Sequence, residues 1–254
     1  MSVTSQEVED KIYTLEQLSS LDSKQVPRHI AFIPDGNRRW AKKISKDASH
    51  GHQKGADILL DIVKACKEMG VQTATFFLFS TENWTRPKTE VHALMWLLKK
   101  YLIQERPRLI KNGVKLSAIG ETSKLPKRVQ TALKDTIEAT AHCEDIEVVF
   151  ALNYGARDEI CRAVGRIVDD IEKDALSKEE ITEKVIGQYL DTSKWEDPDL
   201  LIRTSGEMRV SNFLLWQISY TEVFISPAFW PEFTPDHLLG AVLDYQNREK
   251  RRGV

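Results

Sequence analysis

The chain has 254 residues, of which 41% are hydrophobic and 29% are charged, a balance typical of one ordinary α/β protein. Its 36 Lys and Arg residues against 38 Asp and Glu residues give a net charge of -2, which disfavours a nucleic-acid-binding protein. The three cysteines, Cys66, Cys143 and Cys161, are far apart in sequence, which argues against a disulfide framework and favours a reducing compartment.

The segment 1–25 is polar and acidic and lacks the apolar run of a signal peptide. Apolar runs elsewhere are much shorter than the roughly 20 residues that cross a bilayer. We therefore expect a cytoplasmic protein that would meet lipid only from the aqueous side, as a peripheral membrane protein. Residues 1–26 are expected to form a leader, loosely ordered or helical, ahead of one domain over residues 27–254.

The first half of this domain alternates short β-branched or aromatic runs with helical periodicity. A dense turn signal, Pro34-Asp35-Gly36-Asn37, interrupts the first apolar run. In chain order we expect a strand over 29–33, a helix over 55–70, a strand over 73–79, a helix over 91–110, a strand over 114–119 and a helix over 125–141.

The second half continues the alternation. Ser177 and Glu180 have the spacing of a capping box. We expect strands over 147–152, 200–202 and 223–225, and helices over 158–175, 177–190, 213–216 and 234–251. Repeated strand–helix units predict an α/β fold, a single domain with a mostly parallel central sheet and helices on both faces.

Unusual polar clusters follow the strands, where ligands of parallel sheets bind. They lie at residues 35–40, 80–87 and 203–212, and the segment 51–55 is expected to precede a helix and to aim its N–H groups at an anion. Each cluster alone reads as a turn or a solvated charge run. Together, however, their arginines suit a phosphate or diphosphate bound with a divalent metal, for which Asp35 and Glu222 are the candidate oxygen ligands.

Apolar residues crowd the same strands and the helix that follows the second cluster, including Phe77, Leu78 and Leu94. They either form plain core or line an elongated hydrophobic tunnel that runs back from the charged site. The residue pattern leaves both readings open.

The motifs resemble those of the cis-prenyltransferases of the undecaprenyl diphosphate synthase type over about residues 27–253. The resemblance rests on several separate segments in register. They are HIAFIPDGNRRWA at 29–41, Gly51-His52 with Gly55, FSTENWTRP at 79–87, NYG at 153–155, DLLIRTSGE at 199–207 and RVSNFLLWQ at 209–217.

The resemblance implies condensation of isopentenyl diphosphate with an allylic diphosphate, farnesyl diphosphate being the expected primer, with Mg²⁺ and cis geometry. Asp35 would hold Mg²⁺ on the allylic diphosphate and Glu222 would complete the metal site. Asn83 is the residue assigned to proton removal, although an amide is a poor base, so Asp35 or a diphosphate oxygen could take the proton instead. The implied substrate-binding residues are Gly36, Asn37, Arg38, Arg39, Trp40, His52, Ser80, Thr81, Glu82, Trp84, Arg86, Arg203, Arg209, Val210 and Ser211.

The expected product is a long-chain polyprenyl diphosphate, the undecaprenyl lipid-carrier precursor for cell-wall synthesis, delivered to the membrane. The resemblance also implies a homodimer in which Arg251-Arg252-Gly253 reaches the partner. Three departures stand out: Arg38 occupies a position where similar proteins usually have glycine, residues 44–50 lack an arginine before Gly51-His52, and Leu78 is bulky. Lys46 or His50 could replace the missing arginine.

Two other functions remain as alternatives. A phosphate-ester hydrolase would need a nucleophile or a cluster of carboxylates and histidines, whereas the loops here offer arginines. A non-catalytic partner subunit of a heteromeric prenyltransferase should have lost the site, whereas Asp35, Arg39, Arg203 and Arg209 are all present.

Overall fold

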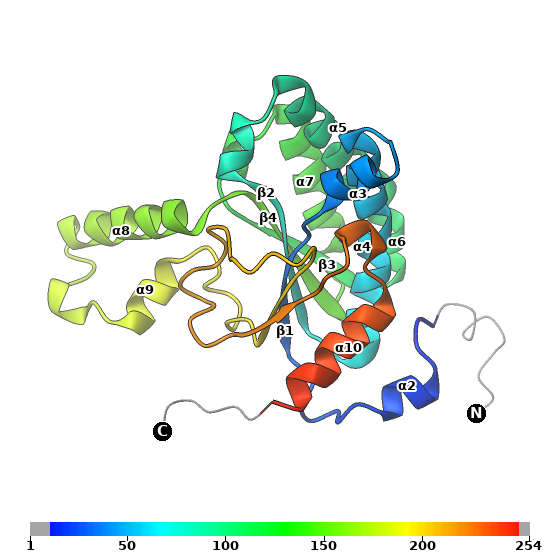
Figure 1. Cartoon of the computed structure of the whole chain (residues 1–254). Coiled ribbons are helices and arrows are strands. Elements are labelled where there is room, and N and C mark those ends of the chain that lie inside the picture. The colour runs from blue at the N-terminus through cyan, green and yellow to red at the C-terminus, as the bar shows by residue number, and fades with distance from the viewer. Residues whose placement is uncertain (1–10, 249–254) are drawn as a thin grey trace.

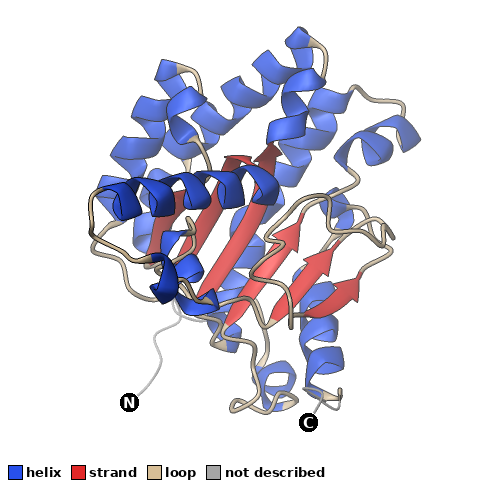
Figure 2. Ribbon diagram, turned by 90° about the vertical axis from the view of Figure 1, so that its left-hand side faces the viewer, coloured by secondary structure: helices blue, strands red, loops and turns tan. Residues whose placement is uncertain are grey.

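A computed structural model describes residues 11–248 and shows six parallel strands in the order β3-β4-β2-β1-β5-β6. Figure 2 shows the strands side by side and pointing the same way. Their bounds are β1 His29–Ile33, β2 Thr73–Ser80, β3 Val114–Ile119, β4 Ile146–Tyr154, β5 Leu200–Arg203 and β6 Glu222–Ile225. The predicted fold class is confirmed, and the strand positions agree closely with the sequence analysis.

Most helices cover one face of the sheet, where the larger apolar core lies between Phe32, Phe76 and Phe150 and the helices (Figure 1). This layer contains α4 Ala48–Met69, α5 Lys88–Gln104, α6 Arg106–Lys111, α7 Lys127–Thr140 and α10 Pro235–Gln246. A smaller core on the other face packs the start of α8 (Ala156–Glu172) and residues 210–218 against Val149 and Leu201.

The short elements complete the chain. They are α2 Leu15–Ser19, α3 Asn37–Lys43, α9 Glu183–Tyr189, and the 3-10 helices η1 Thr81–Thr85, η2 Thr122–Lys124, η3 Lys178–Glu180 and η4 Trp230–Glu232. Within the expected leader, Tyr13 is buried in the larger core and its hydroxyl donates to the carbonyl of Pro235. The segment 251–253, predicted to reach a partner, lies outside the described residues.

Four of the predicted helices are divided, absent or shorter than expected. The helix expected over 91–110 is two helices, α5 and α6, because Pro107 has no N–H and its ring opposes the carbonyl four residues earlier. The stretch 177–190 divides into η3 and α9, although the capping box of Ser177 and Glu180 is confirmed. Residues 213–216 form turns, with Leu214 at φ 47°, and the last helix ends at Gln246.

The helix predicted over 55–70 is α4, and it begins earlier than predicted, at Ala48. Gly51 and Gly55 therefore lie inside α4 and do not precede it. They are needed for close packing, since a Cβ on Gly51 would lie 2.0 Å from the carbonyl oxygen of Asn37, and one on Gly55 2.5 Å from Asn37 Oδ1. Tight contact of α3 with α4 thus outweighs the poor helix propensity of glycine.

Candidate functional site

A cleft of about 1210 Å³ opens at the carboxyl ends of the strands. β1 and β5 are neighbours in the sheet, and the chain leads from β1 to β2 on one side and from β5 to β6 on the other. The cleft lies at this point of divergence, where ligands of such sheets usually bind. The residues following β1, β2 and β5 therefore meet at one place, as the sequence analysis expected. The predicted site residues that line this cleft are Asp35, Gly36, Asn37, Arg38, Arg39, His52, Ser80, Glu82, Asn83, Arg86, Arg203, Arg209 and Ser211.

Asp35 lies at the centre of the hydrogen bonds of this cleft. Its Oδ2 accepts from Arg203 Nη2 at 2.8 Å, and its Oδ1 accepts from the N–H of Gly36 at 2.6 Å and lies 3.3 Å from Arg39 Nη2. Burial alone would raise the pKa of Asp35, but Arg203, Gly36 and Arg39 more than offset this and lower it. The carboxylate is therefore ionised at neutral pH.

Two further arginines extend this ionic chain across the cleft. Arg39 Nη1 lies 2.6 Å from Glu207 Oε1, and Arg39 Nη2 donates to Ser205 Oγ at 2.6 Å. Arg209 Nη1 is paired with the other oxygen of Glu207. Glu207 thus holds two guanidinium groups together in the wall of the cleft.

Arg203 occupies the position where these groups converge. It is the last residue of β5, is paired in register with Ile33 at the end of β1, and is only 3% exposed. Besides Asp35, its Nη1 donates to Ser211 Oγ at 2.8 Å and to the carbonyl of Arg209. One buried side chain therefore connects the β1 loop with the loop after β5.

A second cationic cluster lies on the α5 side and is organised by Glu90, which the sequence analysis missed. Glu90 Oε1 lies 3.1 Å from Arg86 Nη1, 3.7 Å from His52 Nε2 and 3.8 Å from Arg38 Nε. The available signal was the four-residue spacing between Arg86 and Glu90 in the first turn of a helix. This carboxylate holds three side chains that were predicted to bind substrate.

Asn83 sits in a tight turn directly after β2. Its Oδ1 accepts the N–H of Ser80 at 3.2 Å, while the Ser80 side chain accepts the backbone N–H of Asn83 in a capping box. The amide oxygen thus already accepts one hydrogen bond, and the NH₂ group is a donor within the cleft.

Several buried polar atoms around the cleft lack partners. Within residues 11–248, five buried side-chain atoms have no hydrogen-bond partner, and three of them belong to cleft residues: Asn37 Oδ1, His52 Nε2 and Arg203 Nε. Buried polar atoms are otherwise paired in the great majority of cases. This concentration of unpaired atoms indicates a site built for a polar ligand.

An apolar cavity of about 110 Å³ adjoins the cleft between β2, α4 and α5. Both spaces are bordered by Phe77, Leu78 and Leu94, so the cavity lies directly behind the polar groups. Tyr101 also lines it, and the Tyr101 hydroxyl is buried without a partner among the described residues. An engineered apolar cavity of about 150 Å³ binds benzene, so this one has room for roughly one five-carbon unit.

Known proteins with the same sequence pattern are prenyltransferases. The family model described as "Putative undecaprenyl diphosphate synthase" matches residues 33–253. An isoprenyl transferase of Geobacter sulfurreducens is 48% identical over 229 residues, 90% of this chain and 93% of that protein. An isoprenyl transferase of Chlamydia pneumoniae is 43% identical over 257 residues and covers both chains fully. The chain belongs to the undecaprenyl diphosphate synthase family of prenyltransferases.

Two solved structures of similar sequence also have a similar fold. Lavandulyl diphosphate synthase from Lavandula x intermedia, in complex with dimethylallyl diphosphate, has a TM-score of 0.88 and 32% identity, and covers 91% of this chain and 100% of that one. A "probable undecaprenyl diphosphate synthase" from Campylobacter jejuni has a TM-score of 0.75 and 35% identity over 90% of this chain and 99% of that one. The predicted family is confirmed.

The three departures of this prenyltransferase from the usual sequence pattern of the family can be placed in the structure. Arg38 lies in α3 without positive φ, so the position is unstrained and its side chain lines the cleft. Lys46 also lines the cleft, whereas His50 stacks on Trp40 with ring centroids 5.8 Å apart. Arg38 and Lys46 therefore supply positive charge on the α3–α4 side, and Leu78 borders both the cleft and the apolar cavity.

Four residues predicted to bind substrate do not line this cleft. Trp84 Nε1 donates to Asn153 Oδ1 at 2.7 Å, and its ring packs edge-on against Phe79. Val210 packs in the smaller core. Trp40 and Thr81 are likewise absent from the cleft wall. The substrate roles assigned to these four residues stay predictions.

Glu222 also lies away from Asp35 within one chain. It begins β6 and is paired in register with Leu200 at the start of β5, whereas Asp35 follows the carboxyl end of β1. Its Oε2 accepts from Arg248 Nη1 at 2.8 Å. Within a single chain, therefore, Glu222 and Asp35 do not form one binding site, and a metal-binding role for Glu222 stays a prediction.

The donor set at Asp35 fits Mg²⁺ bound mainly by substrate. Among residues 11–248, no three His, Cys, Asp or Glu residues gather into a site that could hold a metal ion alone. Mg²⁺ needs few protein ligands, however, and commonly takes one or two carboxylates together with phosphate oxygens and water. Asp35 offers an ionised carboxylate whose side chain is 28% exposed, at the centre of the arginine clusters.

Stability should depend on His52 between pH 7 and 5. Burial, followed by the charge of Arg86, lowers the pKa of His52 to about 4 despite the opposing effect of Glu90. The unfolded chain binds this proton near pH 6.5, so stability present above that pH is lost as the pH falls toward 4. We expect this histidine to cost about 2 kcal/mol of the free energy of unfolding between pH 7 and 5.

Urea unfolding of the parent protein and of His52→Asn at both pH values measures this loss. Burial also lowers the pKa of His29, which therefore contributes in the same pH window and remains in both proteins. The loss should be smaller in the variant by about 2 kcal/mol. Equal losses in both proteins would show that His52 is protonated in the folded state at pH 5.

Proposed function

We propose that this prenyltransferase condenses isopentenyl diphosphate with an allylic diphosphate, forming a cis double bond. The proposal rests on the position of ionised Asp35, which lies between two cationic clusters in a cleft that adjoins an apolar cavity. The cluster of Arg38, His52 and Arg86 suits the allylic diphosphate, whose tail would enter the cavity. Arg203, Arg209 and Ser211 suit isopentenyl diphosphate, and guanidinium groups suit both because they bind two phosphate oxygens at once.

In this reaction the bond between the allylic carbon and the diphosphate oxygen breaks. The double bond of isopentenyl diphosphate attacks that carbon, a carbon–carbon bond forms, and a proton then leaves the adjacent carbon. Arg38 and Arg86 hold the departing diphosphate as its charge develops, which is where electrostatic stabilisation is most effective. When bound at Asp35, Mg²⁺ supplies additional positive charge to the diphosphate oxygens.

The contacts of Asn83 favour a positioning role over that of a base. Its Oδ1 is already bonded to the N–H of Ser80, and its NH₂ group can only donate. Asp35 is a weak base because Arg203 and Arg39 lower its pKa. We therefore assign the proton to a diphosphate oxygen, with Asn83 orienting the substrate that loses it.

The direct test is incubation with labelled isopentenyl diphosphate, farnesyl diphosphate and Mg²⁺, followed by chain-length analysis of the extracted product. We expect a long-chain polyprenyl diphosphate of the kind that serves as the undecaprenyl carrier precursor in cell-wall synthesis. If folded protein yields no product with any allylic primer, the partner-subunit alternative replaces this proposal. Release of inorganic phosphate from simple esters would favour the hydrolase alternative.

Product length should depend on Leu78 because this side chain borders both the cleft and the cavity. The cavity holds about one isoprene unit, so a longer chain needs α5 to move away from β2 and extend the cavity into a tunnel. Each further CH₂ removed from water contributes about 0.8 kcal/mol, which favours such a movement. We expect Leu78→Ala to shift the products to longer chains, measured by chromatography of the dephosphorylated alcohols.

A matched substitution tests whether the effect is local to the cavity. Leu133→Ala, in the buried face of α7 and absent from the cavity wall, also removes a core leucine. It should lower stability by about 2–5 kcal/mol and leave the distribution of chain lengths unchanged. Identical product distributions from Leu78→Ala and the parent protein would contradict the tunnel proposal.

We further propose that the enzyme is a homodimer that works beside a membrane surface. Apolar side chains are exposed along α8 and the edge strand, namely Val164, Val168, Tyr220 and Val223. Figure 1 shows α8 and α9 extending away from the sheet, where a second copy could cover them. Among the described residues no helix is long and apolar enough to cross a membrane. Sedimentation equilibrium of Val168→Glu against the parent protein tests this association.

A further inference from the structure

Asn212 joins three segments around the cleft through one residue. Its Nδ2 donates to Glu82 Oε1 in the turn after β2 at 2.9 Å. Its Oδ1 accepts the N–H of Arg157 at 3.0 Å, and its carbonyl accepts the N–H of Ala156 at 2.8 Å, both in the first turn of α8. Asn212 itself directly follows Ser211, which is bonded to Arg203.

The backbone around Asn212 is held in an uncommon conformation. Ser211 has φ 50° and Asn212 has φ 63°, in the left-handed region that asparagine tolerates better than most residues. Gly155 leaves space for the side chain, since a Cβ there would lie 2.8 Å from Asn212 Nδ2. Strained residues of this kind persist where surrounding contacts determine them, often at functional sites.

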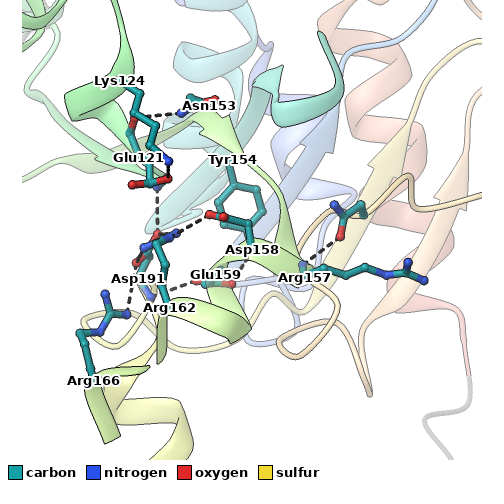
Figure 3. A network of polar contacts seen from close by, with 12 residues as sticks. Glu121, Lys124, Asn153, Tyr154, Arg157, Asp158, Glu159, Arg162, Arg166 and Asp191 are labelled. Carbon is teal, nitrogen blue, oxygen red and sulfur yellow. Dashed lines mark hydrogen bonds and ion pairs between the residues drawn. The ribbon is translucent and has the colours of Figure 1, made fainter. Parts of the chain in front are cut away.

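The α8 end of this connection is anchored by a polar network (Figure 3). Buried Glu159 accepts from the Tyr154 hydroxyl at 2.6 Å and from the N–H of Asp191 at 2.9 Å. Arg162 donates to both carboxylate oxygens of Asp191, at 2.8 and 2.7 Å. Figure 3 shows these residues gathered around the first turns of α8, so Asn212 is attached to a fixed support.

The other end of the connection is the turn that carries Asn83 and leads to Arg86. Burial would raise the pKa of Glu82, but hydrogen bonds from Asn212, its own backbone, Ser80 and Thr81 lower it, so the carboxylate is ionised. Asn212 Nδ2 thus donates to a charged acceptor, the stronger kind of hydrogen bond. Glu82 and half-buried Asn212 both line the cleft, so this bond joins two segments of the cleft wall.

We propose that Asn212 is a positioning residue that sets the spacing between the two halves of the site. It would fix the turn bearing Asn83 against the loop bearing Ser211, and hence the reacting carbons of the two substrates against each other. This inference rests on the proposed condensation. A misplacement of about 1 Å in such a reaction can cost about 100-fold in rate, although each substrate still binds.

Three variants test this role. Asn212→Ala removes the link to Glu82 without changing the net charge. Asn212→Asp keeps an acceptor for Arg157 but places a carboxylate opposite Glu82. The double variant Asn212→Asp with Glu82→Gln restores the original net charge and a hydrogen bond of reversed direction. Asn112→Asp controls for the substitution itself. The Asn112 amide donates to the carbonyl of Arg108 at the end of α6.

For Asn212→Ala we expect kcat to fall about 10- to 100-fold, while calorimetric dissociation constants of isopentenyl and farnesyl diphosphate each stay within about threefold. Asn212→Asp should be at least as slow, and the double variant at least about tenfold faster than Asn212→Asp. Urea unfolding at the assay temperature confirms that the compared proteins are folded; if Asn212→Ala is not, the rescue comparison decides alone.

An unchanged kcat in Asn212→Ala, or no rescue in the double variant, would overturn the inference. Dissociation constants that rise as much as kcat falls would instead make Asn212 a substrate ligand. If the parent protein itself forms no prenyl product, the proposed function fails first. If the parent turns over and the variants match it, only the positioning role fails.

Discussion

Asp35→Asn is expected to lower kcat/KM by about 10³-fold or more, because the substitution removes the ionised carboxylate that lies between the two arginine clusters and is the expected Mg²⁺ ligand. Asparagine keeps an oxygen that can accept from Gly36, so the turn after β1 should persist. The side chain of Arg203, 4% exposed, loses its ionic partner and the protein should lose up to about 3 kcal/mol of stability. Steady-state rates with both diphosphates and urea unfolding measure the two effects.

A diphosphate should partly replace the missing carboxylate as a partner for Arg203 and Arg39. We therefore expect inorganic diphosphate to raise the melting temperature of Asp35→Asn more than that of the parent protein. Asp145→Asn is the matched control, since Asp145 pairs with Lys67 at 2.7 Å just before β4, at the opposite edge of the sheet. Its activity should equal that of the parent. Retained turnover in Asp35→Asn would remove Asp35 from the mechanism.

The sheet and the meeting of its loops could be predicted because both depend on local patterns. Continuous apolar runs such as residues 148–152 identify buried parallel strands, and the carboxyl ends of parallel strands lie at one edge. Asp35, Arg86 and Arg203 lie at or after the ends of three different strands, so they were expected together, and all three line one cleft. Their hydrogen-bond partners were not part of that pattern.

The residues that sequence reasoning missed act through tertiary contacts. Glu90 is an ordinary acidic residue in the first turn of a helix until α5 is placed beside His52 and Arg38. Asn212 connects Glu82 with α8 only because the loop after β5 crosses the start of that helix. No periodicity in the sequence encodes such crossings, since the partners are far apart along the chain.

Some helix boundaries were predicted wrongly, and the reasons are again tertiary contacts. α4 includes Gly51 and Gly55 despite the poor helix propensity of glycine, and both pack closely against Asn37, a tertiary contact that propensity does not predict. The resemblance likewise paired Glu222 with Asp35, whereas the register of β5 with β6 separates them within one chain. A motif gives the residue types of a site, but only the sheet register gives their distances.

Arg203→Lys should lower kcat/KM for isopentenyl diphosphate by about 10²- to 10³-fold and that for the allylic substrate less. The guanidinium binds Asp35 Oδ2 and Ser211 Oγ at once, and its Nε–H has no partner among the described residues. Lysine keeps the charge but offers one compact ammonium, which cannot span these positions. The ion pairs of Glu90, which hold the side chains proposed to bind the allylic diphosphate, do not involve Arg203.

The comparison with Arg106→Lys separates this geometry from general stability. Arg106 Nε donates to Thr136 Oγ1 at 3.1 Å in the α6–α7 layer, away from the cleft, so its lysine variant should turn over normally. Varying each diphosphate while the other saturates gives the two specificity constants. Equal losses for both substrates would mean that Arg203 mainly holds Asp35, because that carboxylate serves both. A larger loss for isopentenyl diphosphate would mean that the guanidinium binds this substrate directly, as its place at the end of β5 implies.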